Sequence, residues 1–164
     1  MVEWPNRAGI GTGIVDVVRD ELRLGARVRL SANDTGNNFT TATAFNGWDT
    51  EEYDDLGIWA SGSASRLTVP GGVTKVILSA SIAIANATAN TEAQIYLHKN
   101  GSTFNGSPGE AGLAGDAFWN ILNIMSGPLS VDTDDYFEVI IQQETDTSVD
   151  VQALLSHFAM WVFK

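Results

Sequence analysis

The sequence predicts an all-β protein built as an antiparallel sandwich, and three observations support this. Several short runs alternate between apolar and polar residues, and turn residues interrupt them about every ten positions. Residues 66–85 hold the longest of these runs. The chain ends in residues 153–163, which are apolar on both faces. Strands of that kind are covered on both sides, so we expect layered sheets around one core.

Length and composition suit a single domain with a real core. The chain has 164 residues, 44% of them hydrophobic, and no cysteine. A disulfide framework and thiolate chemistry are therefore excluded. No apolar run reaches the length of a membrane span, and no secretory signal opens the sequence. We expect synthesis in a host cytoplasm and no membrane partner.

Charge is distributed unevenly along the chain. The net charge is −11, yet the first 29 residues hold five arginines and four acids, a net of +1. The remainder holds 4 basic and 16 acidic residues, a net of −12. The body should therefore repel nucleic acid, and the first segment should contact something else.

Residues 1–25 are predicted to form an N-terminal attachment arm, followed by a head of residues 26–164. The sequence GIGTG at 9–13 lacks the spacing of a dinucleotide-binding loop, so we interpret it as a hinge. Ile14, Val18 and Leu22 lie four apart, which predicts a short amphipathic helix over residues 14–24. Such a helix is marginal alone, so it packs either on its own domain or on a partner. With Arg7, these three residues are the candidate particle anchors.

From residue 26 onward the pattern is β. Residues 27–30 alternate, 33–38 form a turn cluster, and 40–45 and 65–69 suit short strands. Residues 47–57 are acidic and aromatic.

The run over residues 66–85 organises the head. Pro70, Gly71 and Gly72 break it, and the long strand follows. One face of that strand is large and aliphatic and is predicted to face the core: Val76, Leu78, Ala80, Ile82 and Ile84. The opposite face is small and nearly uncharged, which indicates cover by a second layer or another subunit.

Three more strands follow a pattern of the same kind. Residues 93–99 and 136–143 alternate, and 118–124 form an apolar run, whereas 100–115 are predicted to be a long loop. In 136–143, Tyr136 and Ile140 point outward; in the last strand, Trp161 and Phe163 share one face. These four residues are the candidate subunit-interface residues, because the apolar content exceeds what one sandwich core needs.

Three segments in order resemble the C1q/TNF-like jelly-roll family. They are LTVPGGV at 67–73 before a long strand, SGPLSV at 126–131 before DDYFEV at 134–139, and LSHFAMWVF at 155–163. The resemblance implies an antiparallel jelly-roll β-sandwich and a homotrimer, with one sheet of each protomer at the threefold axis. The short arm before such a head is similar to the layout of small bacteriophage virion proteins.

Candidate catalytic and metal sites are weak. His98 and His157 are the two histidines, and no serine lies in a nucleophile-elbow sequence. The carboxylates at 49–55 and at 132–135 form either a Ca²⁺ site or a solvated acidic rim, and paired carboxylates would also suit a glycosidase. We favour the rim and expect no catalytic residue, metal or cofactor.

Three functions remain, and an enzyme that acts on polysaccharide is the least favoured of them. The favoured one is a non-enzymatic, trimeric capsid decoration protein of a bacteriophage, located in the virion and anchored on the major capsid or another virion protein. The alternative is a tail or fibre knob that binds a host glycan or protein through loops such as 100–116 or 48–59.

Overall fold

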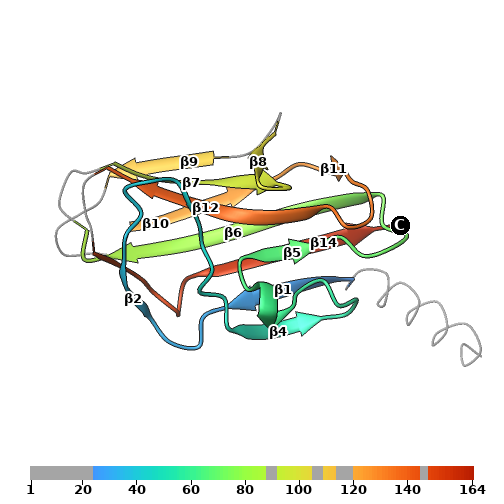
Figure 1. The fold of residues 1–164 in the computed structure, drawn as a ribbon, viewed down its shortest axis with the longest axis horizontal. Helices are drawn as coiled ribbons and strands as arrows, with labels where there is room; N and C mark the ends of the chain where they lie inside the picture. Colours follow the sequence, from blue (N-terminus) through green and yellow to red (C-terminus); the bar gives the residue numbers. More distant parts are fainter. Residues whose placement is uncertain (1–23, 88–91, 105–108, 114–119, 145–147) are drawn as a thin grey trace, which may run out of the picture.

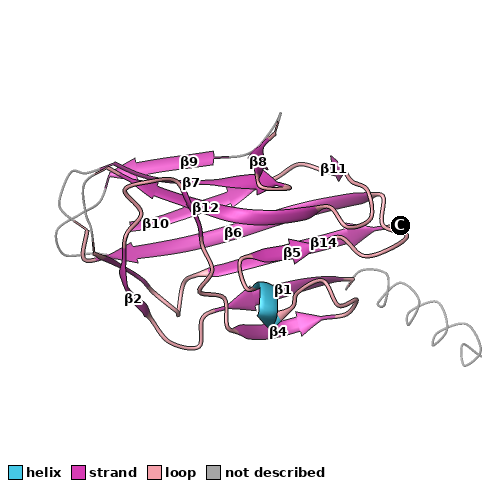
Figure 2. Cartoon of the chain, in the orientation of Figure 1, coloured by secondary structure: helices cyan, strands magenta, loops and turns pink. Residues whose placement is uncertain are grey.

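Two antiparallel sheets pack face to face in the computed structural model, which describes residues 24–87, 92–104, 109–113, 120–144 and 148–164 (Figures 1 and 2). The larger sheet has the order β2 (Asp34–Asn37), β13 (Val149–Val151), β6 (Lys75–Ala85), β14 (His157–Phe163), β1 (Gly25–Arg29), β4 (Thr50–Asp54), and β10 (Asn120–Met125) and β11 (Leu129–Ser130) also pair with β6. The smaller sheet has the order β3 (Thr43–Ala44), β12 (Tyr136–Gln143), β7 (Glu92–Lys99), β8 (Ser102–Thr103), with β5 (Arg66–Thr68) on β12 and β9 (Gly109–Leu113) on β7. The chain passes repeatedly between the two sheets, at β2–β3, β3–β4, β4–β5, β5–β6, β6–β7, β9–β10, β11–β12 and β12–β13.

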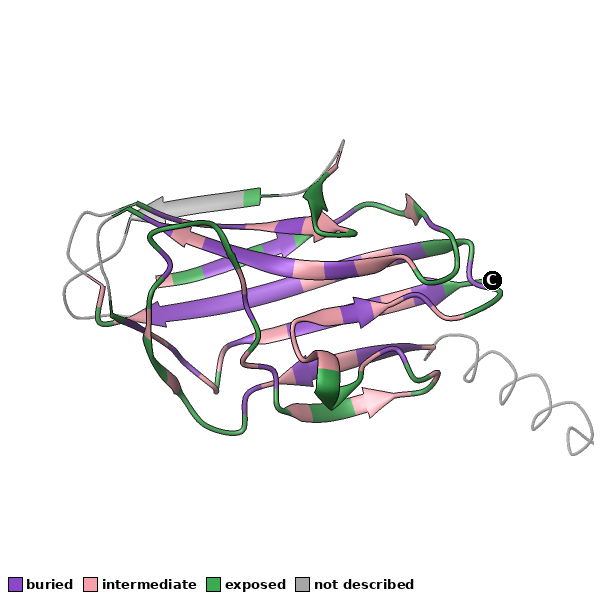
Figure 3. Cartoon of the chain, viewed as in Figure 1, coloured by how far each residue is buried: buried purple, intermediate pink, exposed green. Residues whose placement is uncertain are grey.

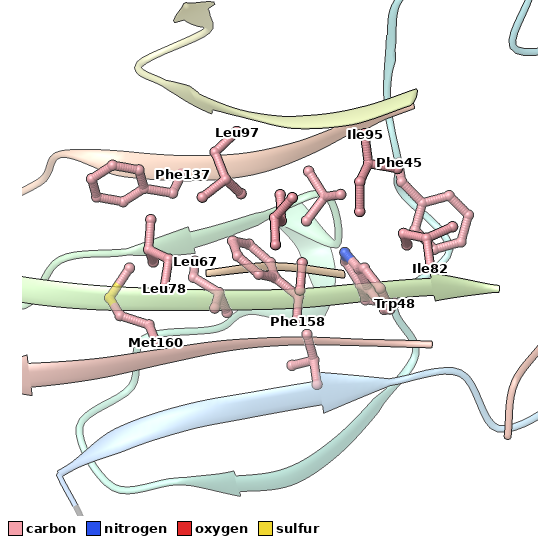
Figure 4. Packing of buried hydrophobic residues seen from close by; sticks show 14 of the residues in the cluster. Phe45, Trp48, Leu67, Leu78, Ile82, Ile95, Leu97, Phe137, Phe158 and Met160 are labelled. Atoms are coloured by element: carbon pink, nitrogen blue, oxygen red, sulfur yellow. The ribbon is translucent and has the colours of Figure 1, made fainter. Parts of the chain in front are cut away.

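Strand β6 lies in the interior of the larger sheet. It pairs antiparallel with β14 and with β10 over most of its length. The predicted core face is confirmed, because Val76, Leu78, Ala80, Ile82 and Ile84 are all buried (Figure 3). Leu97 and Phe137 of the smaller sheet face this strand across the sandwich (Figure 4).

An aromatic cluster fills one part of the core. The rings of Phe45 and Trp48 meet edge to face, with centroids 4.8 Å apart, and Phe158 of β14 lies 6.3 Å from Trp48 (Figure 4). Trp48 is only 1% exposed. The segment suggested as a receptor-binding loop therefore begins with a core anchor, and its middle forms β4.

The structure differs from the predicted strands at three places. The predicted turn cluster at 33–38 contains β2, and the predicted loop at 100–115 contains β8 and β9. The terminal strand begins at His157, because a turn at 153–155 separates it from β13. Asn33 holds that turn: its side-chain amide donates to Gln152 Oε1, and its Oδ1 accepts from the backbone N–H of Ala153.

The one helical turn among the described residues is the 3₁₀ segment Ser61–Ser63. No helix in the described ranges is long and apolar enough to cross a membrane.

Candidate functional site: the outer face of the larger sheet

The outer face of the larger sheet has a floor of small side chains. The register aligns Ser79 with Ala159 and Ser81 with His157, and Ala83 lies further along β6. Ser81, Ala83 and Ala159 are at most 4% exposed although they point away from the core. Small side chains leave the backbone of a sheet accessible to close packing by another flat surface. We call these small residues, with the larger side chains around them, the assembly face.

Large apolar side chains border this floor. Ile121 and Met125 of β10 pair with Ala83 and Ser79, and Trp161 of β14 pairs with Ile77. Four large hydrophobic side chains are exposed among the described residues, namely Ile121 (41%), Met125 (69%), Leu154 (83%) and Phe163 (46%). Three of the four belong to the assembly face; Leu154 lies on the β13–β14 turn. An apolar patch confined to one face is the usual mark of an interaction surface.

The charged part of the assembly face is internally paired. Glu52 of β4 lies between two arginines of β1, with Arg27 Nε 3.1 Å from Glu52 Oε2 and Arg29 Nε 3.3 Å from Glu52 Oε1. All three side chains are more than a third exposed, so these pairs stabilise the monomer little. Burial, reinforced by the charge of Arg27, holds the pKa of His157 below its usual 6.5, so His157 is neutral at pH 7.

The predicted interface residues fall on opposite sides of the sandwich. Trp161 and Phe163 lie on the assembly face. Tyr136 and Ile140 lie on the outer face of the smaller sheet, where Arg66 stacks 4.8 Å from the centre of the Tyr136 ring and Ile140 is 2% exposed. Because each protomer of a cyclic trimer contributes two different surfaces to its two neighbours, the assignment of both pairs to subunit interfaces stays a prediction. Ile121 and Met125 were not among the predicted interface residues, although the run NILNIM carries apolar residues at both even and odd positions.

Two of the carboxylates at 49–55, Asp49 and Asp54, act as local hydrogen-bond acceptors. Asp49 accepts from the backbone N–H and hydroxyl of Ser31, at 2.6 and 2.5 Å. Asp54 accepts from the backbone N–H groups of Leu56, Ile58 and Trp59. Burial raises the pKa of Asp49, but the hydrogen bonds from Ser31 outweigh it and hold the pKa below 3.8.

Asp135 has the same role before β12. Lys99 Nζ lies 2.7 Å from Asp135 Oδ2, and the side-chain amide of Asn100 donates to Oδ1 at 2.7 Å. Burial raises the pKa of Asp135. Lys99 and the hydrogen bonds to the carboxylate lower it by more, so the pKa lies below 3.8. Within the described ranges, no three His, Cys, Asp or Glu side chains come together as a metal site. His98 shares a hydrogen bond with Thr103 Oγ1 at 3.2 Å.

A polar cavity of about 670 Å³ opens on the outer face of the smaller sheet, at the end where β7 begins and β12 ends. Its lining consists of Thr40, Glu92, Gln94, Gln142, Gln143 and Glu144. Gln94 Nε2 donates to Gln142 Oε1 at 3.2 Å, and Glu144 Oε2 accepts from the backbone N–H of Glu92 at 3.3 Å. The sequence analysis did not single out these residues, since their strands pair 48 residues apart.

The predicted arm residues Arg7, Ile14, Val18 and Leu22 lie outside the described residues. Two of the five N-terminal arginines, Arg27 and Arg29, belong to the head, because they lie in β1.

Comparison with known proteins supports the fold and goes no further. No family model matches the sequence, and no curated protein matches it. The structure is similar to Eiger TNF from S. frugiperda (TM-score 0.53, 10% identity, 86% of this chain and 92% of that one) and to murine APRIL (TM-score 0.53, 10% identity, 85% and 98%). It is also similar to the globular domain of zebrafish complement 1qA (TM-score 0.51, 8% identity, 86% and 98%). The head therefore has the antiparallel jelly-roll fold of TNF and C1q domains.

Proposed function

We propose that this protein is a non-enzymatic structural protein that forms a homotrimer through the assembly face and joins a larger particle through its N-terminal arm. The particle we propose is a bacteriophage virion, with the head as a capsid decoration. The arm would then contact the major capsid protein or another virion protein.

The gathering of three of the four exposed large hydrophobic side chains on the assembly face carries the trimer part of this proposal. Ile121, Met125 and Phe163 surround a floor that is already flat and uncharged. Burying such side chains against equivalent ones is favourable at roughly 25 cal/mol per Å² of apolar surface. A closed ring of identical subunits satisfies every copy of the patch. The C1q/TNF-like resemblance points to three subunits.

A role without chemistry agrees with the use of the acidic side chains. Asp49, Asp54 and Asp135 hold loops by accepting hydrogen bonds from nearby backbone and side-chain donors. Their oxygens stabilise the loops of the head. This is a structural role for three acids that the sequence also suggested as metal ligands or catalytic carboxylates.

The structure changes the electrostatic argument for the arm. Without Arg27 and Arg29, residues 1–23 hold three arginines and four acids, a net of −1, and residues 24–164 hold 6 basic and 16 acidic residues, a net of −10. The arm is far less acidic than the head but is not basic. Burial of Ile14, Val18 and Leu22, at roughly 1.5–3 kcal/mol for each fully buried side chain, is then the main source of attachment energy. Three arms on one trimer would act together.

Removal of the arm tests particle attachment. The truncation should end at residue 23, because Leu24 packs against the core and its carbonyl accepts from the N–H of Val162 at 3.1 Å. Full-length and truncated proteins are added to particles that lack the protein, and co-sedimentation is measured. We expect the truncated protein to keep its assembly state and lose particle binding. Equal binding by both proteins would place the docking surface on the head instead.

A matched variant separates apolar attachment from charge. Val18→Ser should weaken co-sedimentation strongly, whereas Arg7→Gln should weaken it only at low salt, because exposed charges are screened within about 10 Å at 0.1 M salt.

A further inference from the structure

We propose that the polar cavity at the β7–β12 end of the smaller sheet binds a neutral sugar. This site lies on the sheet opposite the assembly face and does not depend on the arm. The inference goes beyond the structural role proposed above, and it gives a chemical class to the receptor of the alternative knob function.

The donors and acceptors of the cavity match a polyol. Glu92, Gln94 and Gln142 alternate outward on two adjacent strands, and Glu144, one residue past the end of β12, continues the alternation, so the four side chains share one face. The Gln94–Gln142 hydrogen bond fixes both amides and leaves Gln94 Oε1 free to accept and the Gln142 amide free to donate toward a ligand. Glu144 is likewise oriented by the N–H of Glu92. Carboxylates accept from sugar hydroxyls, and amides both donate and accept.

An aromatic surface continues the same face. Tyr96 lies two residues after Gln94, about 7 Å along the strand, and it pairs with Ile140 as Gln94 pairs with Gln142. The Tyr96 and His98 rings lie 5.4 Å apart, and both residues are half-buried. A pyranose has an apolar C–H face that packs on an aromatic ring, while its hydroxyls reach polar groups at the ring edge. The face therefore offers an aromatic ring at Tyr96 and polar groups at the neighbouring pair of Gln94 and Gln142.

Other ligand classes fit the lining less well. No Lys, Arg or His is among the six described lining residues, and two of the six are carboxylates, so a phosphate, sulfate or acidic sugar would be repelled. None of the six is aliphatic or aromatic, so a lipid or a flat apolar ligand has nothing to contact inside. An amine is the remaining competitor, because it would be attracted by the carboxylates. It would gain nothing from the donor amide of Gln142.

The test uses the full-length protein and defined probes. Methyl glycosides of glucose, galactose, mannose and N-acetylglucosamine are compared with glucuronic acid and spermidine by saturation-transfer NMR. The ¹⁵N spectrum is recorded in parallel. We expect at least one neutral glycoside to bind, and to shift the side-chain amide resonances of Gln94 and Gln142. Glucuronic acid should not bind.

Variants assign the binding to the cavity. Gln142→Leu and Glu144→Gln should each lower the affinity for that glycoside about tenfold, the effect of losing or neutralising one strong hydrogen bond. Glu51→Gln, which removes an exposed carboxylate from β4 on the other sheet, should leave the affinity unchanged. The wild-type amide shifts keep the test decisive if a variant fails to fold.

Three results would overturn the proposal: binding of spermidine but of no glycoside, absence of any glycoside signal from folded protein, or glycoside binding with unshifted Gln94 and Gln142 amides. None of them bears on the trimer or on the arm, so the failure of this inference is separable from failure of the structural role.

Discussion

Replacing Met125 with serine should weaken the trimer and leave the protomer folded. Met125 is 69% exposed at the edge of the assembly face, so its side chain contributes little to the core of its own subunit. In the proposed trimer the same side chain is covered by a neighbouring subunit. The substitution therefore separates assembly from folding.

The expected size follows from the exposed fraction. Full burial of a methionine side chain stabilises by about 1.5–3 kcal/mol. With 69% of Met125 still exposed in the protomer, assembly would gain about 1–2 kcal/mol per copy. Three equivalent copies give about 3–6 kcal/mol, a factor of roughly 10²–10⁴ in the association constant.

Leu154→Ser is the matched control. Leu154 is also a large exposed hydrophobic residue, at 83%, but it lies on the β13–β14 turn, outside the strands that form the assembly face. Sedimentation velocity over a dilution series measures the association constant of wild type and both variants, and circular dichroism checks the fold. The reasoning is refuted if Met125→Ser assembles like wild type, or if Leu154→Ser weakens assembly as much as Met125→Ser does.

Two further predictions concern the protomer itself. Asp54→Ala should lower the free energy of unfolding by about 2–3 kcal/mol in urea titration, since three backbone N–H groups lose their acceptor, and Asp55→Ala should change it little. The pKa of His157 is lower in the folded state than in the unfolded state, so the unfolded state takes up a proton first as the pH falls. Stability therefore falls as the pH drops below about 6.5. His157→Gln should reduce this loss of stability in thermal melts from pH 8 to 5, and His98→Gln serves as the control. A melt profile that stays unchanged in His157→Gln would contradict that account.

Strong alternation made the long central strands predictable. Strand β12 has the predicted bounds, and the predicted core face of β6 is buried residue for residue. These strands contain enough consecutive residues for one face to differ clearly from the other. The short edge strand β2 could not be found this way. It exists because β13 offers a pairing partner more than a hundred residues later.

The candidate sites were less predictable because they depend on pairing between distant strands. Nothing in the segment 47–57 marks Trp48 as a core residue; its burial follows from the approach of Phe45 and Phe158. The cavity residues are ordinary polar positions until β7 and β12 place them side by side. The exposure of Ile121 and Met125 on an outer face was indicated by the sequence, because their strand carries apolar residues at both even and odd positions.

The mass of the assembled protein tests the central claim most directly. Light scattering coupled to size exclusion, on wild-type protein over a wide concentration range, reports the mass in solution. The account predicts three times the 17.6 kDa of one chain, and a shift toward one chain on dilution of Met125→Ser. A wild-type protein that remains at 17.6 kDa at every concentration would contradict it.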